Sequence, residues 1–432
     1  MKIEDLAQQV KQASIQLAAC SANLKNRALA GIIHSLALEK EAVFSANQAD
    51  LRRSEQENLA MPLLKRLKFD EAKLQTALAG IENLIRLPDP VGKTLQATEL
   101  DQGLELYRVT CPIGVIGVIF ESRPDALVQI AALCLKSGNG VIMKGGAEAR
   151  ETNRVLAEII HKATVAAGLP ENWLKLLTSR AEVNDLLKMD DFIDLIIPRG
   201  SNEFVRYIMG HSRIPVMGHA DGICHCYVAE DADPEQAVKI IVDSKTQYVA
   251  VCNALETLLV HEGVTPRFWE ILKKEMDLKQ VELTGCPATQ KRIPVTPATE
   301  ADWRTEYLDY KLSIKIVADL DEAINHINTY GSGHTDSIIT NDPKKAARFM
   351  ALVDSGNVFW NCSTRFSDGF RYGLGAEVGI STAKIHARGP VGLDGLVIYK
   401  YQLIGNGQIV ADYENHSKTF THRQLNKEFP LH

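Results

Sequence analysis

The sequence has no long hydrophobic run. Its longest apolar stretch, near Val115 to Phe120, is far shorter than the roughly 20 residues that a membrane span needs. The first five residues, Met-Lys-Ile-Glu-Asp, lack the apolar core of a signal peptide. We therefore expect a soluble, cytoplasmic protein with no membrane partner.

Basic charge is not in excess either, and cysteines are few and scattered. The 432 residues carry 48 Lys and Arg against 54 Asp and Glu, which gives a formal net charge of −6. This balance argues against nucleic acid as the main partner. The eight cysteines form no disulfide-like framework, which fits a reducing compartment. At this length, with 45% hydrophobic residues, we expect a globular protein of two or three domains.

From residue 112 the chain alternates short apolar runs with segments of helical periodicity. Near-continuous Val, Ile and Leu strands between helices indicate a parallel sheet covered on both faces, so the fold class is α/β. Ligands then belong at the carboxyl ends of those strands. The predicted strands are Val115–Phe120, Val141–Lys144, Trp173–Leu177 and Phe192–Ile197, and the helices between them are Ala126–Lys136 and Glu148–Ala167.

The predicted division of the chain follows these changes of pattern. Residues 99–111 alternate apolar and polar, as an arm strand with one wet face would, and such an arm suggests at least a dimer. The tail from Asn415 is polar, and we expect it to be poorly ordered. The predicted parts are a cofactor domain (1–98, a helical preface, and 112–250), a catalytic domain (251–364), a return segment (365–398), an oligomerisation arm (99–111 and 399–414) and a tail (415–432).

Cys252 lies where a helix is predicted to pass into a strand. Asp233-Pro234 reads as the start of an amphipathic helix, and Thr257 to Val260 reads as a strand. A thiol at such a junction can be exposed, with backbone N–H groups nearby that lower its pKa and bind an oxyanion. The alternative is a small buried hydrophobe, which is the commoner role for an unselected cysteine.

Three turns follow predicted strands of the first sheet. Ser122 and Arg123 precede Pro124 after the first strand, and Lys144-Gly145-Gly146 follows the second. Gly200-Ser201 follows a third strand, where Ser201 or Asn202 can cap the next helix. None matches the Gly-x-Gly-x-x-Gly fingerprint, and each alone is weak evidence. Together the three turns predict a dinucleotide at this sheet edge.

Metal binding is not expected. Cys224-His225-Cys226 resembles half a metal site, but strand alternation sends the two sulfurs to one face and the imidazole to the other. No second cysteine pair at a zinc-finger spacing follows. His334 and Arg365 lie in turn-like segments, where each is as readily a structural residue as a substrate contact.

Several motifs resemble the gamma-glutamyl phosphate reductase family, a branch of the aldehyde dehydrogenase superfamily. The resemblance runs from about residue 10 to 405. It implies an aldehyde-dehydrogenase-like fold, with a Rossmann-type parallel-sheet cofactor domain, an α/β catalytic domain and a small β arm for oligomerisation. The motifs are Val118-Ile-Phe-Glu-Ser-Arg-Pro124, Ile197-Pro-Arg-Gly200, Cys252-Asn253 with Glu256-Thr-Leu-Leu259, Ser363-Thr-Arg-Phe366, the segment Ala323 to Ile338, Gly373-Leu-Gly-Ala-Glu377 and His386-Ala-Arg-Gly-Pro390.

The resemblance also implies an activity. Cys252 would attack L-glutamyl 5-phosphate, expel phosphate and form a thioester, which hydride from NADPH reduces to L-glutamate 5-semialdehyde. This is the second step of proline biosynthesis from glutamate. The acyl phosphate would come from a separate glutamate kinase, with direct handover of the unstable compound as one route.

Site residues follow by position from the same resemblance. Ser122 and the Cys252 N–H are the expected oxyanion donors, and Asn253 joins the catalytic set. Lys144, Gly145, Gly146, Gly200 and Ser201 correspond to positions that hold the cofactor, and Glu306 to one that holds the nicotinamide ribose. Arg123, Arg365 and Arg388 are candidates for the substrate's carboxylate or phosphate, because a guanidinium suits both groups.

One departure from the wider superfamily bears on the reaction. Hydrolytic aldehyde dehydrogenases place a glutamate before a Gly-Gly pair to activate water, whereas this chain has His219-Ala-Asp-Gly222 there. The missing carboxylate favours a reductase whose thioester survives until hydride or phosphate reaches it. His219 as a base leaves open the alternative of a hydrolytic aldehyde dehydrogenase that yields a free acid. A non-enzymatic scaffold on the same fold is the third reading.

Overall fold

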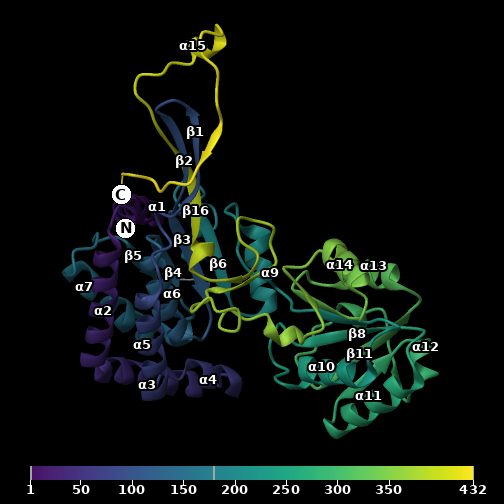
Figure 1. Ribbon diagram of the computed structural model, residues 1–432. Coiled ribbons are helices and arrows are strands. Elements are labelled where there is room, and N and C mark those ends of the chain that lie inside the picture. The colour runs from purple at the N-terminus through teal and green to yellow at the C-terminus, as the bar shows by residue number, and fades with distance from the viewer. Residues whose placement is uncertain (1, 179–180, 432) are drawn as a thin grey trace. The chain divides into compact units, whose positions relative to one another are not determined.

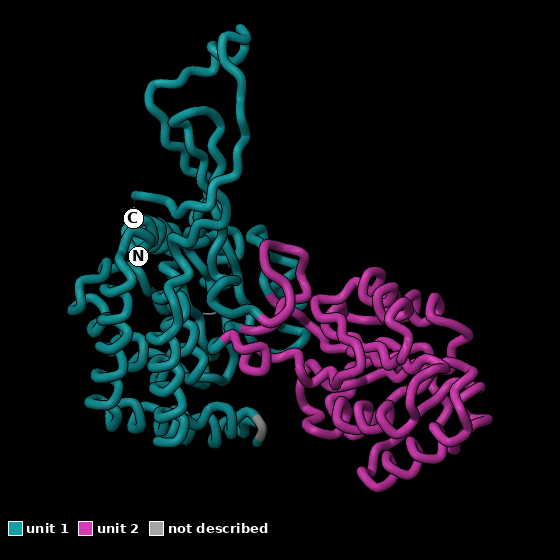
Figure 2. Tube along the Cα trace, viewed as in Figure 1, with its two compact units in different colours: residues 1–217, 375–378, 391–432 teal, residues 218–374, 379–390 magenta. Residues whose placement is uncertain are grey.

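The computed structural model describes residues 2–178 and 181–431, and these divide into two compact units. Figure 2 colours the two units separately. Unit 1 comprises residues 1–217, 375–378 and 391–432, and unit 2 comprises residues 218–374 and 379–390. The predicted boundary at residue 250 therefore differs from the observed one. The reason is that the strand Cys224–Val228 pairs with strands on both sides within the sheet of unit 2.

Unit 1 is built on a four-stranded parallel sheet in the order β5-β4-β3-β6. Helix α1 and residues of α8 and α9 pack on one face, while α6 contacts β4, α7 contacts β5, and α2, α3 and α5 pack on α6 and α7 (Figure 1). The strands are β3 (Val115–Phe120), β4 (Gly140–Lys144), β5 (Leu174–Leu177) and β6 (Leu195–Arg199). The helices are α1 (Ile3–Ala18), α2 (Ala22–Leu38), α3 (Lys40–Gln56), α4 (Met61–Leu67), α5 (Glu71–Arg86), α6 (Pro124–Lys136), α7 (Arg150–Ala166), α8 (Ala181–Leu186) and α9 (Asn202–His211), with the 3-10 turns η1 (Ala147–Ala149) and η4 (Leu393–Leu396).

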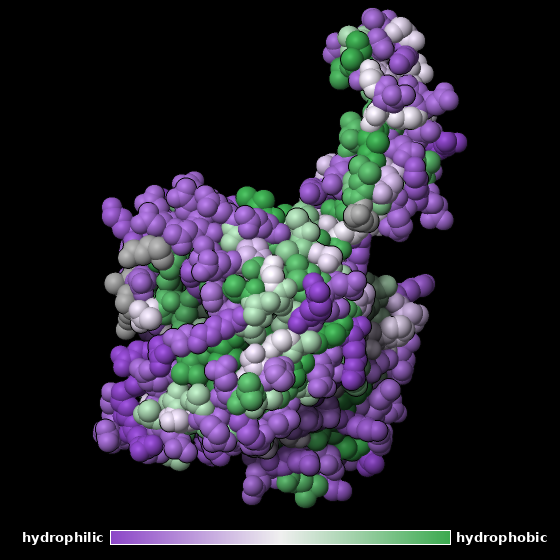
Figure 3. All heavy atoms as spheres, turned by 90° about the vertical axis from the view of Figure 1, so that its left-hand side faces the viewer, coloured by the Kyte–Doolittle hydropathy of each residue, from purple (hydrophilic) through white to green (hydrophobic). Residues whose placement is uncertain are grey.

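A second sheet of unit 1 forms an antiparallel arm in the order β16-β2-β1-β17. The C-terminal tail, expected to be poorly ordered, is instead structured. Strand β17 pairs with β1, and the ring of Phe429 packs edge-on against that of buried Tyr107, with the ring centroids 5.3 Å apart. Apolar side chains lie among hydrophilic ones along this arm (Figure 3). Its elements are β1 (Thr94–Asp101), β2 (Leu104–Pro112), β16 (Val397–Ile404), α15 (Ala411–Glu414) and β17 (Arg423–Leu425).

Unit 2 is a three-layer α/β structure around a parallel sheet in the order β10-β9-β11-β8-β7-β12-β13. Helices α10 and α11 cover one face, and α13 and α14 cover the other. Side chains along each strand alternate between the two faces of the sheet and so between the two hydrophobic cores. In β7, Cys226 and Val228 face α10, while Tyr227 faces α13 and α14. The strands are β7 (Cys224–Val228), β8 (Leu255–His261), β9 (Glu282–Gly285), β10 (Thr296–Pro297), β11 (Lys311–Val317), β12 (Thr335–Ile339) and β13 (Asn357–Trp360). The helices are α10 (Pro234–Thr246), α11 (Pro266–Leu278), α12 (Pro287–Gln290), α13 (Leu320–Tyr330) and α14 (Pro343–Leu352), with turns η2 (Asp302–Arg304) and η3 (Thr364–Phe366) and the short strands β14 (Gly379–Ser381) and β15 (Gly389–Val391).

Candidate functional site

Cys252 lies in the loop that joins α10 to β8, as its position in the sequence predicts. Asp233 caps α10 by accepting a hydrogen bond from the Gln236 N–H at 2.8 Å. The helix ends at Thr246, and a turn closed by the Ala254 N–H and the Val251 carbonyl at 3.1 Å carries the cysteine into β8. Its side chain is half-buried. The thiol is therefore held at the edge of the sheet rather than in the core.

The backbone of Cys252 is pressed against Gly222. A methyl group at Gly222 would lie 2.0 Å from the Cys252 carbonyl oxygen and 2.4 Å from its Cα, far inside van der Waals contact. Only glycine permits so close an approach. The buried thiol of Cys224, at the start of β7, donates to the same carbonyl at 3.2 Å. Both contacts fix the position of the Cys252 backbone.

Two imidazoles lie beside the Cys252 sulfur. One ring nitrogen of His219, one of His334 and the Cys252 Sγ all lie within 4.8 Å of one another. The two rings meet edge-on with centroids 4.9 Å apart. His219 is half-buried, whereas His334 is fully buried at the start of β12. The sequence alone does not decide whether His334 has a structural or a functional role. The fold places it beside the thiol.

The protonation of this histidine pair follows from its contacts. His219 Nδ1 lies 2.8 Å from the Ile380 carbonyl, which can only accept, so Nδ1 carries the proton and Nε2 the lone pair. Burial, and then the charge of His219, hold the pKa of His334 well below its usual range. His334 is therefore neutral at physiological pH. The same burial makes His334 a weak proton acceptor, which leaves the half-buried His219 as the better base for the thiol.

Asn253 positions the cysteine loop from its other side. Its amide donates to the Ser367 carbonyl at 2.7 Å, and the Thr364 hydroxyl donates to its backbone carbonyl at 2.8 Å. The side chain is buried. These bonds tie the loop to the segment after β13, so the geometry of Asn253 favours a positioning role over direct contact with substrate.

Two more predicted residues, Arg365 and Glu306, lie in unit 2. Arg365 is buried, and its Nε donates to Gln247 Oε1 at 2.9 Å. Burial lowers the pKa of its guanidinium, and negative charge on Cys252 acts in the opposite direction, which places Arg365 within electrostatic reach of the thiol. Burial chiefly raises the pKa of Glu256, and the nearby carboxylate of Glu306 adds to that effect. Arg365 thus belongs to the surroundings of Cys252, and Glu306 lies near Glu256 at the start of β8.

A buried ion pair lies at the base of the cysteine loop. Lys245 Nζ is 2.7 Å from Glu256 Oε2, and both side chains are fully buried. Burial raises the pKa of Glu256 to about 7 against the opposing pull of Lys245, and burial lowers the pKa of Lys245. The Leu308 N–H also donates to Glu256 at 3.3 Å. The pair connects the last turn of α10 to the start of strand β8, on either side of Cys252.

Lys245→Met alone is expected to lower the free energy of unfolding by about 3–5 kcal/mol, because it leaves the Glu256 carboxylate buried without its counter-charge. Lys245→Met/Glu256→Leu is expected to be closer to the wild type than the single variant. Urea unfolding measures both, with the exposed pair Arg348 and Asp321 as control, where Arg348→Ala should change stability by at most about 1 kcal/mol. Additive losses in the double variant would contradict the pairing argument.

A second neutral histidine makes stability depend on pH. Burial, then the charges of His225 and Lys315, lower the pKa of His326 to about 3. Because this folded pKa is below the unfolded value of about 6.5, the unfolded chain binds the proton more readily between the two values. The contribution of neutral His326 to stability is therefore complete above about pH 6.5 and is lost as pH falls.

The free energy of unfolding should accordingly decline less between pH 7 and 4 in His326→Gln than in the wild type, with a difference in slope of up to about 1.4 kcal/mol per pH unit. Urea unfolding at successive pH values measures this. Exposed His34 on α2 is the matched control, and His34→Gln should leave the slope unchanged. Equal slopes for the His326 variant and the wild type would show that the ring is charged in the folded state.

The predicted cofactor turns lie in unit 1, at the carboxyl ends of β4 and β6. Lys144 is buried at the end of β4, and its ammonium donates to the Gly145 carbonyl. A methyl group at Gly146 would lie 1.9 Å from Glu148 Oε1. After β6, a methyl at Gly200 would lie 2.4 Å from Glu121 Oε2, which also accepts from the Ser201 N–H at 2.9 Å, and Ser201 caps α9. Since β3 lies between β4 and β6, the turns share one sheet edge.

Ser122 follows β3 at the same edge and has an unusual conformation. Its φ is +44°, a left-handed value that is uncommon outside glycine. Its N–H and its hydroxyl both donate to Glu148 Oε1, at 2.6 and 2.7 Å. The strained backbone is thus stabilised by a carboxylate within unit 1, while Cys252 belongs to unit 2.

The two remaining arginine candidates differ in their contacts. Arg123 is exposed at the start of α6. Arg388 is half-buried, and its guanidinium donates to the Thr382 carbonyl at 3.2 Å, to the Asp354 carboxylate at 2.9 Å and to the Asp354 carbonyl at 3.0 Å. The pKa of Asp354 is lowered by hydrogen bonds from Lys384 and Arg388. The contacts of Arg388 are those of a structural clamp.

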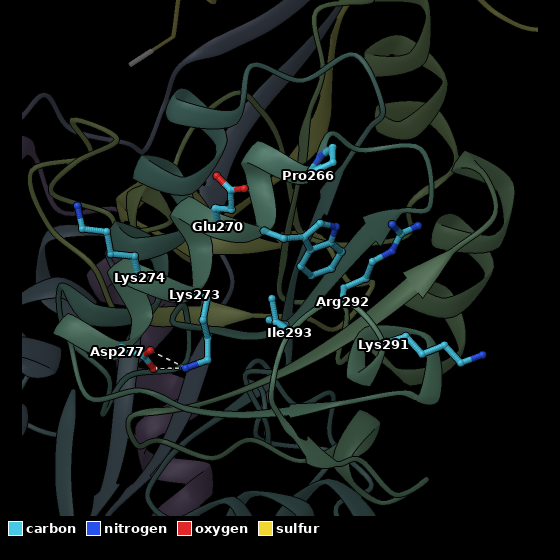
Figure 4. Close-up of a pocket in the computed structure, with 9 residues that line it drawn as sticks. Pro266, Glu270, Lys273, Lys274, Asp277, Lys291, Arg292 and Ile293 are labelled. Carbon is cyan, nitrogen blue, oxygen red and sulfur yellow. Dashed lines mark hydrogen bonds and ion pairs between the residues drawn. The ribbon is translucent and has the colours of Figure 1, made fainter.

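A hollow elsewhere on unit 2 is separate from the thiol (Figure 4). It has a volume of about 680 Å³ between α11 and the segment after α12, and Trp269 and Ile293 form its apolar part. Lys273 at its rim pairs with Asp277 at 2.5 Å. None of the residues around Cys252 lines it.

Among the helices of residues 2–178 and 181–431, none is both long and apolar enough to cross a bilayer.

The fold and the cysteine loop define a class. A thiol before a central strand of one parallel sheet, together with glycine turns at the strand ends of a second sheet, is the arrangement expected of an aldehyde dehydrogenase. The sequence model of the aldehyde dehydrogenase family matches residues 38–311 and 311–374.

Individual relatives narrow the class. The gamma-glutamyl phosphate reductase of Acetivibrio thermocellus is 70% identical over 431 residues, 100% of both chains, and that of Pelotomaculum thermopropionicum is 71% identical over 100% of this chain and 99% of its own. The crystal structure of gamma-glutamyl phosphate reductase from Thermotoga maritima matches with a TM-score of 0.92 at 36% identity, covering 95% of this chain and 100% of that one. The chain belongs to the gamma-glutamyl phosphate reductases, a branch of the aldehyde dehydrogenase family.

Proposed function

We propose that this chain reduces L-glutamyl 5-phosphate to L-glutamate 5-semialdehyde and phosphate with NADPH, the second step of proline biosynthesis from glutamate. The observation that carries the proposal is the environment of Cys252. Its thiol is half-exposed, its backbone is held by contacts with Gly222 and Cys224, and two imidazoles lie within 4.8 Å of its sulfur. The names of the full-length relatives support the choice of substrate.

The reaction begins when the Cys252 thiol gives its proton to a neighbouring base. His219 is suited to this, because its Nδ1–H is held by the Ile380 carbonyl and its Nε2 has the lone pair. The thiolate attacks the acyl carbon, the bond from that carbon to the phosphate oxygen breaks, and a thioester remains. The cofactor, when bound, supplies the hydride that reduces the thioester. The resulting hemithioacetal releases the semialdehyde and regenerates the thiol, and the product cyclises to pyrroline-5-carboxylate.

The negative oxygen that forms during attack needs hydrogen-bond donors. The backbone N–H of Cys252 and the hydroxyl of Ser122 are the proposed pair. Each such donor typically lowers the barrier by about 2.7–4 kcal/mol. For this role the Ser122 hydroxyl must exchange its bond to Glu148 for one to the substrate. Its left-handed backbone fits a residue held in a set orientation for function.

The choice between reduction and hydrolysis depends on water activation. Hydrolytic relatives have a glutamate before a Gly-Gly pair as their base, and at that place this chain has His219-Ala-Asp-Gly222 instead. We infer that the thioester is long-lived towards water and reacts with hydride, or with phosphate in the reverse direction. A hydrolytic aldehyde dehydrogenase is the alternative, and it is favoured only by the imidazole of His219 beside the sulfur.

The chemistry at the sheet edge of unit 1 fits a dinucleotide. Lys144, Gly145 and Gly146 after β4, and Gly200 and Ser201 after β6, are the proposed contacts for its phosphates and ribose. The ammonium of Lys144 suits anionic and hydroxyl oxygens, and the Ser201 N–H already binds an anionic group, the Glu121 carboxylate. In unit 2, Glu306 is the proposed partner of the nicotinamide ribose. The preference for NADPH over NADH is part of the proposal.

Substrate anions are assigned to arginines. Arg365 is the first choice, because it lies within electrostatic reach of Cys252. Arg123 is exposed and is the second candidate. Arg388 remains a candidate only through its position in the family motif, since its donors serve Asp354 and Thr382. A separate glutamate kinase is the proposed supplier of the acyl phosphate, and the cytoplasm the proposed location.

The arm is proposed to join subunits. Strand β16 is at the edge of its sheet and exposes Tyr401 and Leu403 at 60% and 57%. An exposed apolar edge strand is a template for pairing with another chain. Tyr401→Lys/Leu403→Lys is expected to lower the molar mass measured by light scattering to that of one chain. Leu278→Lys, at an equally exposed apolar residue of α11, should leave the mass unchanged; equal masses for both variants would remove β16 from the interface.

The proposed function is tested by NADP+ reduction with L-glutamate 5-semialdehyde, with and without inorganic phosphate. Strict dependence on phosphate is expected, because the thioester must be transferred to phosphate to complete the cycle. Turnover without phosphate, with free glutamate as product, would establish the hydrolytic alternative. No turnover under either condition, with a folded protein, would overturn the assignment.

A further inference from the structure

We propose that His219, Cys252 and His334 form a Zn²⁺ site, and that a bound ion blocks the thiol. The three ligand atoms come from three segments of unit 2: the loop before β7, the loop before β8, and the start of β12. All three lie within 4.8 Å of one another. The inhibitory part of this inference rests on the proposed function, whereas the binding part does not.

The ligand set suits zinc. One thiolate and two imidazoles, with no carboxylate, are soft to borderline donors that favour Zn²⁺ over Mg²⁺ or Ca²⁺. With bonds of about 2.3 Å to sulfur and 2.0–2.1 Å to nitrogen, tetrahedral geometry places neighbouring ligand atoms about 3.3–3.6 Å apart. His334 is fully buried, so the half-buried side chains of Cys252 and His219 would have to close the remaining distance of up to about 1.5 Å.

The surroundings of the histidines provide independent support. A metal-binding imidazole typically donates its other N–H to a carbonyl or carboxylate, and His219 Nδ1 does so to the Ile380 carbonyl at 2.8 Å. The Nε2 of His334 is completely buried and has no hydrogen-bond partner. Its Nδ1 contacts the Thr335 hydroxyl at 2.8 Å and the Cys224 sulfur at 3.7 Å. A buried polar atom without a partner is costly, and a metal ion would satisfy it.

A three-ligand site leaves a fourth position for water, as in catalytic zinc sites. The consequence here is the opposite of catalysis. The sulfur lone pair that must attack the acyl carbon would be donated to the ion, and Nε2 of His219 could no longer accept the thiol proton. Zinc binding and thioester formation are therefore mutually exclusive at Cys252.

The sequence predicts no such site, because it points to the wrong residues. His225 pairs with buried Asp336 at 3.0 Å, and Cys226 lies in the core against α10. The Cys-His-Cys run thus contributes no ligand to the group. The actual set is separated by tens of residues, and no local spacing marks it.

Anaerobic titration of the full chain with Co²⁺ tests the binding part directly. A cobalt–thiolate charge-transfer band in the near ultraviolet is expected, saturating at one ion per chain. Cys252→Ala should abolish the band. His219→Gln should weaken binding by more than the roughly 10- to 100-fold that loss of an outer-shell partner costs. Cys362→Ser and His261→Gln, changes at a thiol and an imidazole outside the group, should bind like the wild type.

Zn²⁺ should displace the cobalt and inhibit phosphate-dependent NADP+ reduction, and EDTA should restore it. A band that survives Cys252→Ala, or equal affinity in His219→Gln and His261→Gln, would overturn the site. His219 is half-buried, so its variant keeps the test valid if a change at buried His334 prevents folding. A cobalt–thiolate band in a protein without reductase activity would support the metal site and contradict the proposed function. Reductase activity that depends on Cys252, without a cobalt–thiolate band, would support the proposed function and contradict the metal site.

Discussion

Cys252→Ala is expected to lower kcat for phosphate-dependent NADP+ reduction by about four orders of magnitude or more, as loss of a covalent nucleophile does in other enzymes. The physical reason is that no other group can form the acyl bond at this place in the loop. Initial rates at saturating semialdehyde and phosphate measure the effect. Because the side chain is half-buried in a loop, thermal unfolding should hardly change.

The matched control is another half-buried cysteine of unit 2. Cys362 lies outside the group of His219, Cys252 and His334, and Cys362→Ser should retain wild-type kcat. If Cys252→Ala kept more than a few per cent of the wild-type rate, hydride transfer would not proceed through a thioester at this residue, and the role of the thiol would have to be given up.

Gly222→Ala has the second largest expected effect. The added methyl would lie 2.0 Å from the Cys252 carbonyl oxygen, and the neighbouring atoms are backbone that cannot rotate away. The cysteine loop must shift by about 1 Å, and a misplacement of that size costs roughly 100-fold in rate. We expect kcat/KM to fall by at least that factor and alkylation of Cys252 by iodoacetamide to change its rate.

Gly80→Ala is the control for this change. Gly80 lies within α5, where a methyl group would meet nothing within 4 Å. Alanine is also the better helix former, by about 1 kcal/mol. Gly80→Ala should keep full activity and equal or greater stability. Full activity in Gly222→Ala would mean that the contact does not set the position of the thiol.

Much of the fold follows from local signals in the sequence. Strand β3 occupies Val115–Phe120 as predicted, and α10 begins after its Asp233 cap, because a buried apolar run and a capping pair are determined by neighbours along the chain. The place of Cys252 between α10 and β8 is confirmed for the same reason.

Features that depend on long-range pairing could not be predicted. The sequence pattern predicts a boundary near residue 250, whereas unit 2 begins at Gly218, because β7 belongs to its sheet through pairing with β8 and β12. The polar composition of the tail predicts disorder, yet β17 forms a strand because it pairs with β1. Gly222 lies against the backbone of Cys252 and His334 lies beside its thiol, and both contacts join segments that are far apart in the sequence.

The most direct measurement of the central claim is the intact mass of the enzyme after brief mixing with L-glutamate 5-semialdehyde and NADP+ in the absence of phosphate. The account predicts one glutamyl group in thioester linkage on Cys252, absent in Cys252→Ala and removed by added inorganic phosphate. Release of free glutamate without phosphate, or an acyl group on any other residue, would contradict it.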